Sequence, residues 1–299
     1  MQSATKKKCE KVYKIFTFPN FKQNPKSKLK TKQKIFFAKI IYRLIRIFFP
    51  KKIRVKRRGI EWSLNLSEAI DLHIFVFGSF EIKITNVAKK LHLEKYNQII
   101  DIGANFGVQS LQFAKNFTNS KIYSVEPTNY AFNKFIKNLE LNQKLSKNIH
   151  PFQIFLGSKE KAIPTSIYSS WNLESKEDKH IKHLGEKKST EESNSLTLDE
   201  FVILNKISNV DFIKLDVDGF EYDVLKGGMN FLMEKKPPIF MELAPYLYKE
   251  YGYNKEKILN LITSLNYNFY DLKKLKKIFD IEQKISDIKD GSSENILLM

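Results

Sequence analysis

Short apolar runs alternate with segments of helical hydrophobic spacing over most of the chain after residue 97. The runs have the length and the Ile, Val, Leu and Phe content of buried strands. They cover 98–102, 121–126, 150–156, 211–216, 238–243, 267–272 and 294–299. The helical segments cover 82–91, 108–117, 131–141 and 255–265. Alternation of this kind predicts an α/β fold with a doubly wound, mostly parallel sheet.

Two regions interrupt the alternation. Residues 62–80 predict short strands and turns, with 78–81 as a turn. Residues 158–195 are rich in Ser, Lys and Glu and predict an irregular insertion. After it, Thr197 and Glu200 have the spacing of a capping box, which predicts that a helix begins there.

Charge divides the chain into a basic leader and a near-neutral body. Residues 1–60 contain 20 Lys and Arg against one acid, Glu10, whereas the remaining 239 residues contain 31 basic and 32 acidic side chains. The net charge of +18 therefore belongs to the leader. The single cysteine, Cys9, is also there, so an intrachain disulfide is excluded and the body has no cysteine nucleophile. The Lys-rich start does not resemble a signal peptide, and we expect a cytoplasmic protein.

The leader contains a basic amphipathic segment. Twelve of the 15 residues in 35–49 are apolar, and a helix of that length is too short to span a bilayer. Lys39, Arg43 and Arg46 share one helix face, and basic residues follow Pro50. Residues 35–58 are therefore a candidate for peripheral attachment to an anionic membrane, on its inner face. The alternative is a helix docked on the body. Nucleic-acid binding is disfavoured, because Phe and Ile at helical spacing form no base-stacking platform.

Candidate chemistry lies where the predicted strands end, since ligands of open α/β sheets bind at that edge. Residues 101–107 read Asp-Ile-Gly-Ala-Asn-Phe-Gly, a tight loop in which Gly103 and Gly107 would let the backbone approach a cofactor. The three-glycine dinucleotide pattern is missing, which favours a cofactor without pyrophosphate. Glu126 ends the next strand, where an acid can accept both ribose hydroxyls of an adenosine ligand.

The strand at 211–216 ends in a group of acids. Asp216, Asp218 and Glu221 fall within six residues, which is costly unless a cation or a proton donor faces them. A sulfonium cofactor would supply the cation and a substrate hydroxyl the proton. The alternative is that Asp218 and Glu221 cap the next helix.

Together these motifs resemble the FkbM family of class I methyltransferases. The resemblance rests on 101–107, Glu126-Pro127, 214–221 and 224–227, with 77–81 and 295–298 also fitting. It implies a Rossmann-like sheet of seven strands with an antiparallel last strand, S-adenosylmethionine as cofactor, and O-methylation, often of a sugar or glycan hydroxyl. One departure is Asp218, where the family commonly has Glu.

The resemblance also implies roles for individual residues. Asp216 would be catalytic, orienting or deprotonating the acceptor hydroxyl, and Glu126 would hold the ribose. The remaining expected cofactor-binding residues are Asp101, Gly103, Ala104, Asn105 and Gly107 around the methionine part, and Leu156, Gly157 and Ser158 near the adenine.

The expected organisation is a leader over 1–60, an N-terminal cap of the catalytic domain over 61–97, and a methyltransferase domain over 98–299. The insertion at 158–195 is expected to hold acceptor-binding residues such as 169–172.

Several alternatives are disfavoured. The fourth strand lacks the Asn/Asp-Pro-Pro-aromatic turn of base-amine methyltransferases. Asp216 and Glu242 end neighbouring strands, but a third metal ligand is not visible in the sequence, so we expect no metal. Two functional hypotheses follow. One is an O-methyltransferase acting on a saccharide or lipid-linked glycan. The other is a non-catalytic membrane- or RNA-associated protein on a methyltransferase scaffold.

Overall fold

The computed structural model describes residues 31–91, 98–175, 179–182 and 184–299. The first half of the predicted leader, with Cys9 and Glu10, lies outside the described residues. The chain divides into two compact units. The first comprises the described residues up to Phe80 together with Ser170–Ser175, and the second begins at Glu81 and contains the rest. The sequence placed boundaries after residues 60 and 97, whereas the compact units divide after Phe80.

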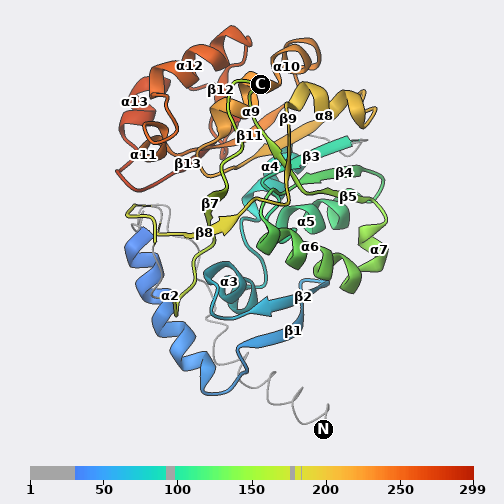
Figure 1. The fold of residues 1–299 in the computed structure, drawn as a ribbon, viewed down its shortest axis with the longest axis vertical. Helices are drawn as coiled ribbons and strands as arrows, with labels where there is room; N and C mark the ends of the chain where they lie inside the picture. Colours follow the sequence, from blue (N-terminus) through green and yellow to red (C-terminus); the bar gives the residue numbers. More distant parts are fainter. Residues whose placement is uncertain (1–30, 92–97, 176–178, 183) are drawn as a thin grey trace. The chain divides into compact units, whose positions relative to one another are not determined.

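The second unit is built on one large sheet. Its strands are β3 (Gln98–Ile102), β4 (Lys121–Val125), β5 (Ile149–Phe152), β10 (Phe212–Leu215), β11 (Ile239–Leu243), β12 (Phe269–Tyr270) and β13 (Glu294–Leu298). Their order is β12-β13-β11-β10-β3-β4-β5 (Figure 1). Pairing from β11 to β5 is parallel, and β13 is antiparallel to both β11 and β12. The seven-stranded sheet with an antiparallel last strand is confirmed. Strand order reverses between β3 and β10, which makes their carboxyl ends the expected ligand site.

Helices cover both faces of this sheet. They are α4 (Lys83–Lys90), α5 (Val108–Asn116), α6 (Asn129–Leu141), α7 (Gln143–Ser146), α8 (Leu198–Leu204), α9 (Glu221–Gly227), α10 (Met229–Lys235), α11 (Pro245–Tyr248), α12 (Lys255–Ser264) and α13 (Ile281–Ser286). Ile100, Ile213 and Leu215 join one buried cluster with residues of α8, α9, α10 and α12. On the opposite face the ring of Phe212 meets Phe113 of α5 edge-on, with centroids 6.0 Å apart. Burying both faces explains why these strands are almost wholly apolar.

The predicted third strand, 150–156, is in fact two strands. β5 ends at Phe152, and β6 (Ile154–Leu156) leaves the large sheet to pair in parallel with β9 (Asn194–Leu196). Since β5 is the edge strand, it has no outer neighbour to hold the chain in the sheet. The insertion at 158–195 is also more regular than expected, because β7 (Ser166–Ser169) and β8 (Glu186–Ser189) form an antiparallel pair. The helix start at Thr197 is confirmed, with both bonds of the capping box present.

The first unit combines a hairpin with two helices. β1 (Lys52–Arg57) and β2 (Ile60–Asn65) pair antiparallel, and α3 (Ala69–Phe77) packs on them and on α2 (Thr31–Arg46). Ser170–Ser175 adds to this unit through backbone bonds from Ala69 N–H to Trp171 O and from Leu173 N–H to Ser67 O. Three of the four residues expected to hold the acceptor, 170–172, therefore lie in the first unit.

The prediction of strands and turns over 62–80 is wrong for its second half, which is the helix α3. The segment is an almost continuous apolar run, and such a run does not distinguish a buried helix from a buried strand. The helix ends in a left-handed cap at Gly78, whose N–H donates to Ile74 O at 2.8 Å. Asp71 in its first turn accepts a bond from Asn65 N–H at 2.6 Å. A contact distant in sequence also holds the start of the helix, because Ala69 N–H donates to Trp171 O at 2.9 Å.

We expect Gly107→Ala to destabilise the second unit more than Gly252→Ala does. Both glycines have positive φ, 85° and 82°, so the backbone strain of the substitution is similar. A Cβ at Gly107 would lie 2.2 Å from the ring of Phe135, whereas at Gly252 nothing lies within 4 Å. Overpacking should add about 1–3 kcal/mol to the loss in Gly107→Ala. Urea unfolding of the two variants measures the difference, and equal losses would contradict the packing argument.

Candidate functional site

The loop after β3 is held against the ends of both neighbouring strands. The N–H groups of Gly103 and Ala104 both donate to the carbonyl of Val125, at 2.9 Å each, at the end of β4. On the other side Asp216 N–H donates to Ile102 O at 3.2 Å. The loop therefore lies at the point where the strand order reverses, which is where a ligand is expected.

The two loop glycines are required by protein neighbours. A Cβ on Gly103 would lie 1.8 Å from the carbonyl oxygen of Asp216, and φ is 76° there. Gly107 meets Phe135 as described above. Asn105 between them has a positive φ of 50°, a conformation that Asn tolerates better than most residues. Close packing of the loop on β10 and α6 thus explains both glycines without a ligand, and their predicted contact with a cofactor stays a prediction.

Glu126 is 5% exposed and fastens the loop to the end of β4. Its Oε2 accepts from Asn105 N–H at 2.9 Å, and its Oε1 accepts from the N–H and the hydroxyl of Thr128. Burial raises the pKa of Glu126, and these hydrogen bonds oppose the rise. A carboxylate offers about four lone-pair sites, so acceptor capacity remains for a ribose hydroxyl.

Lys214 is the buried cation beneath the loop. Its side chain is 4% exposed, and its Nζ donates to Gly103 O at 2.6 Å and to Ile102 O at 3.2 Å. It also lies 3.6 Å from Asp101 Oδ1 and 3.7 Å from Asp216 Oδ2. Burial alone would lower the pKa of Lys214, but the surrounding carboxylates, Asp216 first, outweigh burial and raise it. Lys214 therefore stays protonated and links the loop to β10.

Asp101 has no exposed surface. One carboxylate oxygen accepts from the Ser110 hydroxyl at 2.6 Å, and the other faces Lys214. Asp101 thus supports the loop from within. Its predicted contact with the methionine part of a cofactor stays a prediction.

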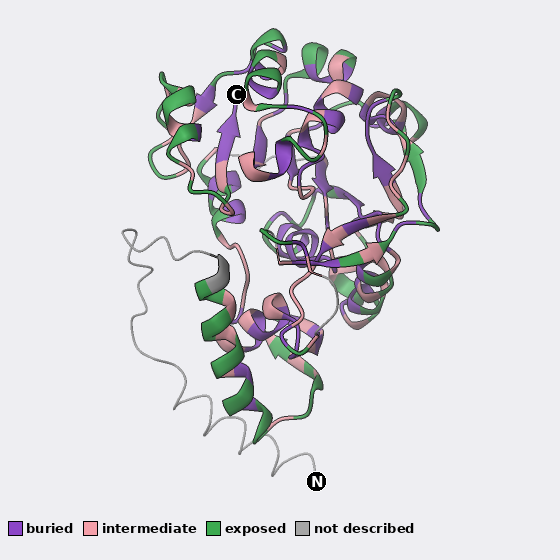
Figure 2. Cartoon of the chain, turned by 60° about the vertical axis from the view of Figure 1, so that its left-hand side comes forward, coloured by how far each residue is buried: buried purple, intermediate pink, exposed green. Residues whose placement is uncertain are grey.

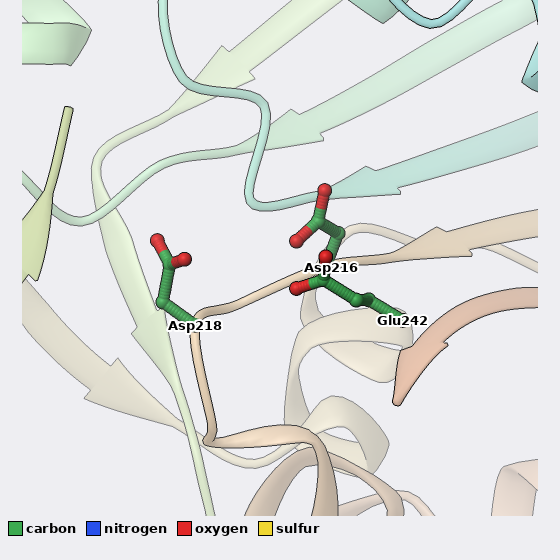
Figure 3. Close-up of side chains that lie close together, drawn as sticks. All are labelled: Asp216, Asp218 and Glu242. Carbon is green, nitrogen blue, oxygen red and sulfur yellow. The ribbon is translucent and has the colours of Figure 1, made fainter. Parts of the chain in front are cut away.

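Three carboxylates meet at the ends of β10 and β11. Asp216, Asp218 and Glu242 each bring an oxygen within 4.8 Å of the others (Figure 3). In the close-up, the carboxylates of Asp216 and Glu242 lie next to each other, with Asp218 across from them. Burial raises the pKa of Asp216 and, more strongly, that of Glu242, and the neighbouring carboxylates add to both shifts. The charge of Lys214 and a hydrogen bond with Glu242 oppose the rise in the pKa of Asp216.

The three carboxylates change the basis of the prediction that the site holds no metal. That expectation rested on the lack of a third ligand beside Asp216 and Glu242, and Asp218 now supplies one. The sequence hid it because the turn through Asp218, with φ of 51°, brings its side chain back toward Asp216. The cluster can therefore either hold a divalent cation or share a proton, since oxygen ligands suit Mg²⁺.

Glu221 closes the loop that carries Asp218. It is the first residue of α9, and its Oε1 accepts from the N–H groups of Val217, at 3.1 Å, and Gly219, at 3.3 Å. Burial raises the pKa of Glu221 to about 8. These bonds close the loop before α9 and are not bonds to the N–H groups of the helix, so both roles considered for Glu221 stay predictions.

The residues expected near the adenine use their polar groups within the protein. Leu156 belongs to the main core cluster. Gly157 N–H donates to Leu196 O at 3.0 Å, and the Ser158 hydroxyl donates to Asp223 at 3.2 Å. Their role in binding adenine stays a prediction.

Sequence reasoning missed Lys214 and Thr128. The first had a visible signal, because Lys214 is the single polar residue of an otherwise apolar strand, Phe-Ile-Lys-Leu. A lysine inside a fully buried strand requires an anionic or carbonyl partner. Nothing in the sequence pointed to Thr128, since its role depends on the position that the carboxylate of Glu126 takes in the fold.

A protein-family model, described as Methyltransferase FkbM domain, matches residues 101–269, which is more than half of the chain. No curated protein sequence shows significant similarity.

Among solved structures, an FkbM methyltransferase of Methylobacillus flagellatus is 13% identical with a TM-score of 0.39, covering 68% of this chain and 44% of that one. The match thus spans less than half of that protein. A putative O-methyltransferase of Klebsiella pneumoniae is 9% identical, with a TM-score of 0.42 and coverage of 73% and 79%. TYW2 of M. jannaschii, in complex with AdoMet, is 13% identical, with a TM-score of 0.40 and coverage of 84% and 85%.

We expect Lys214→Met to cost about 3–5 kcal/mol of unfolding free energy, because it leaves the buried Asp101 carboxylate without its cation. Lys284→Met is the matched control, since Lys284 pairs with Glu294 at 2.9 Å but both side chains are 27% exposed. The control should lose about 1 kcal/mol or less. Chemical denaturation measures both, and adding Asp101→Asn to Lys214→Met should recover part of the loss. A cost for Lys214→Met no larger than the control's would contradict the role of Lys214.

The pKa of Glu221 predicts a pH dependence of stability. Because the folded-state pKa, about 8, exceeds the ordinary value of 4.5, the protonated form is favoured by folding. This contribution is complete below pH 4.5 and is lost as pH rises toward 8. Glu221→Gln keeps an acceptor for the two loop N–H groups and cannot ionise. Its unfolding free energy should therefore fall less than that of the wild type between pH 5 and 8, by on the order of a few kcal/mol. Parallel pH profiles would disprove the assignment.

Proposed function

Because the chain belongs to the FkbM methyltransferase family, and is thus an S-adenosylmethionine-dependent methyltransferase, we propose that it methylates a hydroxyl of a saccharide or lipid-linked glycan. The observation that carries the proposal is the meeting of the glycine loop, Glu126 and the Asp216 cluster at one edge of the sheet. The alternative hypothesis, a non-catalytic scaffold, offers no reason for a carboxyl pair with raised pKa values at that edge.

The residues at this edge fit the cofactor. Asp216, Asp218 and Glu242 form an anionic cluster that suits a sulfonium cation, and Glu126 retains acceptor capacity for one ribose hydroxyl. The described loop has no lysine or arginine of its own for phosphates, consistent with a cofactor that lacks them. S-adenosylmethionine, when bound, supplies the methyl group in activated form.

In the proposed step, Asp216 accepts the proton of the acceptor hydroxyl. The hydroxyl oxygen forms a bond to the methyl carbon, and the carbon–sulfur bond breaks with its electron pair going to sulfur. Because the leaving group is already activated, positioning supplies much of the rate enhancement. A raised pKa brings Asp216 closer to the working range of a general base.

The proposed acceptor class rests on the number of acceptor oxygens at the site. A saccharide presents adjacent hydroxyls, and three carboxylates within 4.8 Å can accept from more than one of them. An acceptor with a single hydroxyl would leave part of the cluster unpaired, which is costly where the groups are partly buried.

We extend the proposal to location, as a peripheral protein at the inner face of a membrane, where a lipid-linked acceptor would be presented. The basic leader supports this extension. None of the described helices is long and apolar enough to cross a membrane.

Calorimetric titration with S-adenosylmethionine and S-adenosylhomocysteine tests the cofactor site. We expect micromolar-range binding by the wild type and at least about tenfold weaker binding by Glu126→Ala, because the ribose contact and the loop anchor are both lost. Thr128→Val separates these effects, since it removes only a bond to Glu126. Glu282→Gln, an exposed substitution, is the control. Absence of binding to the wild type would overturn the enzyme hypothesis in favour of the scaffold.

Asp216→Asn should reduce methyl transfer by about 10²–10⁴-fold while the cofactor dissociation constant changes only a few-fold. The assay follows labelled methyl groups into glycan and lipid extracts, with and without EDTA. Loss of activity with EDTA, restored by Mg²⁺, would assign the carboxylate cluster to a metal. If a cofactor-binding protein labelled no glycan or lipid fraction, the acceptor proposal would fail while the family assignment stood.

A further inference from the structure

Helix α2 presents three different faces around its axis. Residues along it that are three or four positions apart share a face. One face is buried, one is basic and one is apolar and exposed. Figure 2 shows that much of the surface of this helix is exposed. A helix that merely docks on its own unit needs the first face and a polar remainder, so the third requires a separate explanation.

The buried face accounts for the packing of α2 within the first unit. Tyr42 and Ile45 are 6% and 2% exposed, and α2 contacts α3. The Tyr42 hydroxyl donates to Glu174, and Lys51 pairs with the same carboxylate. Packing of this helix on its own unit therefore accounts for the buried face of α2, and it leaves the other two faces uncovered.

The exposed apolar face is large for a single short helix. Its six residues lie on α2 and in the turn that follows it, and each is at least two-fifths exposed. They are Phe36 at 61%, Phe37 at 51%, Ile40 at 42%, Leu44 at 46%, Ile47 at 71% and Phe48 at 61%. Contiguous apolar surface of this kind on a soluble protein marks an interaction site.

Positive charge borders this face. Lys39, Arg43 and Arg46 are exposed along one side of it. Elsewhere in the same unit, β1 carries Lys52, Arg54 and Lys56, exposed at alternate positions. Across 31–80 and 170–175 there are eleven Lys and Arg against four Asp and Glu. The partner must therefore combine an apolar interior with negative surface charge, as an anionic lipid bilayer does.

We propose that the apolar face of α2 inserts into the headgroup region of an anionic membrane, with the helix lying in the plane of the surface. The 16 residues of α2 are about 24 Å long, short of a span but suited to an in-plane position. The basic residues then meet lipid phosphates. The inference rests on the membrane location proposed above, but its test needs neither cofactor nor acceptor.

The experiment is co-sedimentation of the full-length protein with vesicles of phosphatidylcholine alone or mixed with phosphatidylserine, at low and high salt. The apolar variant is Phe36→Ser/Ile40→Ser/Ile47→Ser. The charge variant is Lys39→Gln/Arg43→Gln/Arg46→Gln. The control, Ile203→Ser/Leu204→Ser/Phe279→Ser, removes three apolar side chains of the second unit that are 73%, 66% and 88% exposed, so more apolar surface is removed than in the apolar variant.

We expect the wild type and the control to bind mixed vesicles, and the apolar variant to bind at least about tenfold more weakly at both salt concentrations. The charge variant should bind mixed vesicles more weakly than the wild type and show a smaller salt dependence, since three of the 20 basic residues in 1–60 are removed. Circular dichroism confirms that each variant is folded.

Three results would overturn the proposal. Vesicle binding by the apolar variant equal to that of the wild type would remove the role of α2. Binding of an RNA oligonucleotide that survives in the apolar variant, with no vesicle binding by the wild type, would assign the charge to nucleic acid. Self-association of the wild type that the apolar variant loses, again without vesicle binding, would make this face an interface between two copies of the chain.

Discussion

A buried lysine with four oxygen neighbours organises the candidate site. Lys214 contacts two carbonyls of the β3 end and two carboxylates, so it links the loop that a cofactor would meet to the strand that carries Asp216. Desolvating an ammonium group is costly unless partners replace its water. The position of the loop therefore depends on both carboxylates, those of Asp101 and Asp216. The close approach of Gly103 to Asp216 O tightens the same junction.

The acids of the candidate site fall into two groups, those that support the loop after β3 and those of the carboxylate cluster. Glu126 accepts three hydrogen bonds from Asn105 and Thr128, whereas Asp101 accepts one from Ser110 of α5 and faces Lys214. Asp216, Asp218 and Glu242 meet at the edge of the sheet, and the pKa values of Asp216 and Glu242 are raised. In the proposed step, Asp216 accepts the proton of the bound hydroxyl. Lys214 lies close to both Asp101 and Asp216 and so connects the two groups of acids.

The basic part of the chain is organised differently from the candidate site. Its charge is confined to the leader, and within the described part of that leader α2 divides its surface between packing, charge and exposed apolar side chains. Phe36 and Ile47 are not needed to hold α2 in its unit, whereas Tyr42 and Ile45 are. The face proposed for membrane attachment and the residues proposed for methyl transfer lie in different compact units of the chain.

The amino-acid pattern was enough to predict the alternation of strands and helices, the sheet edge at which the acids gather and the basic character of the leader. These features depend on local hydrophobic periodicity and charge, which are read directly along the chain. Four features became visible only in the folded chain. Residues 69–77 form a helix, 150–156 divides between two sheets, Gly107 faces Phe135, and Asp218 joins Asp216 and Glu242. Each of these depends on partners distant in sequence, and local pattern contains no information about which distant residue will be the neighbour.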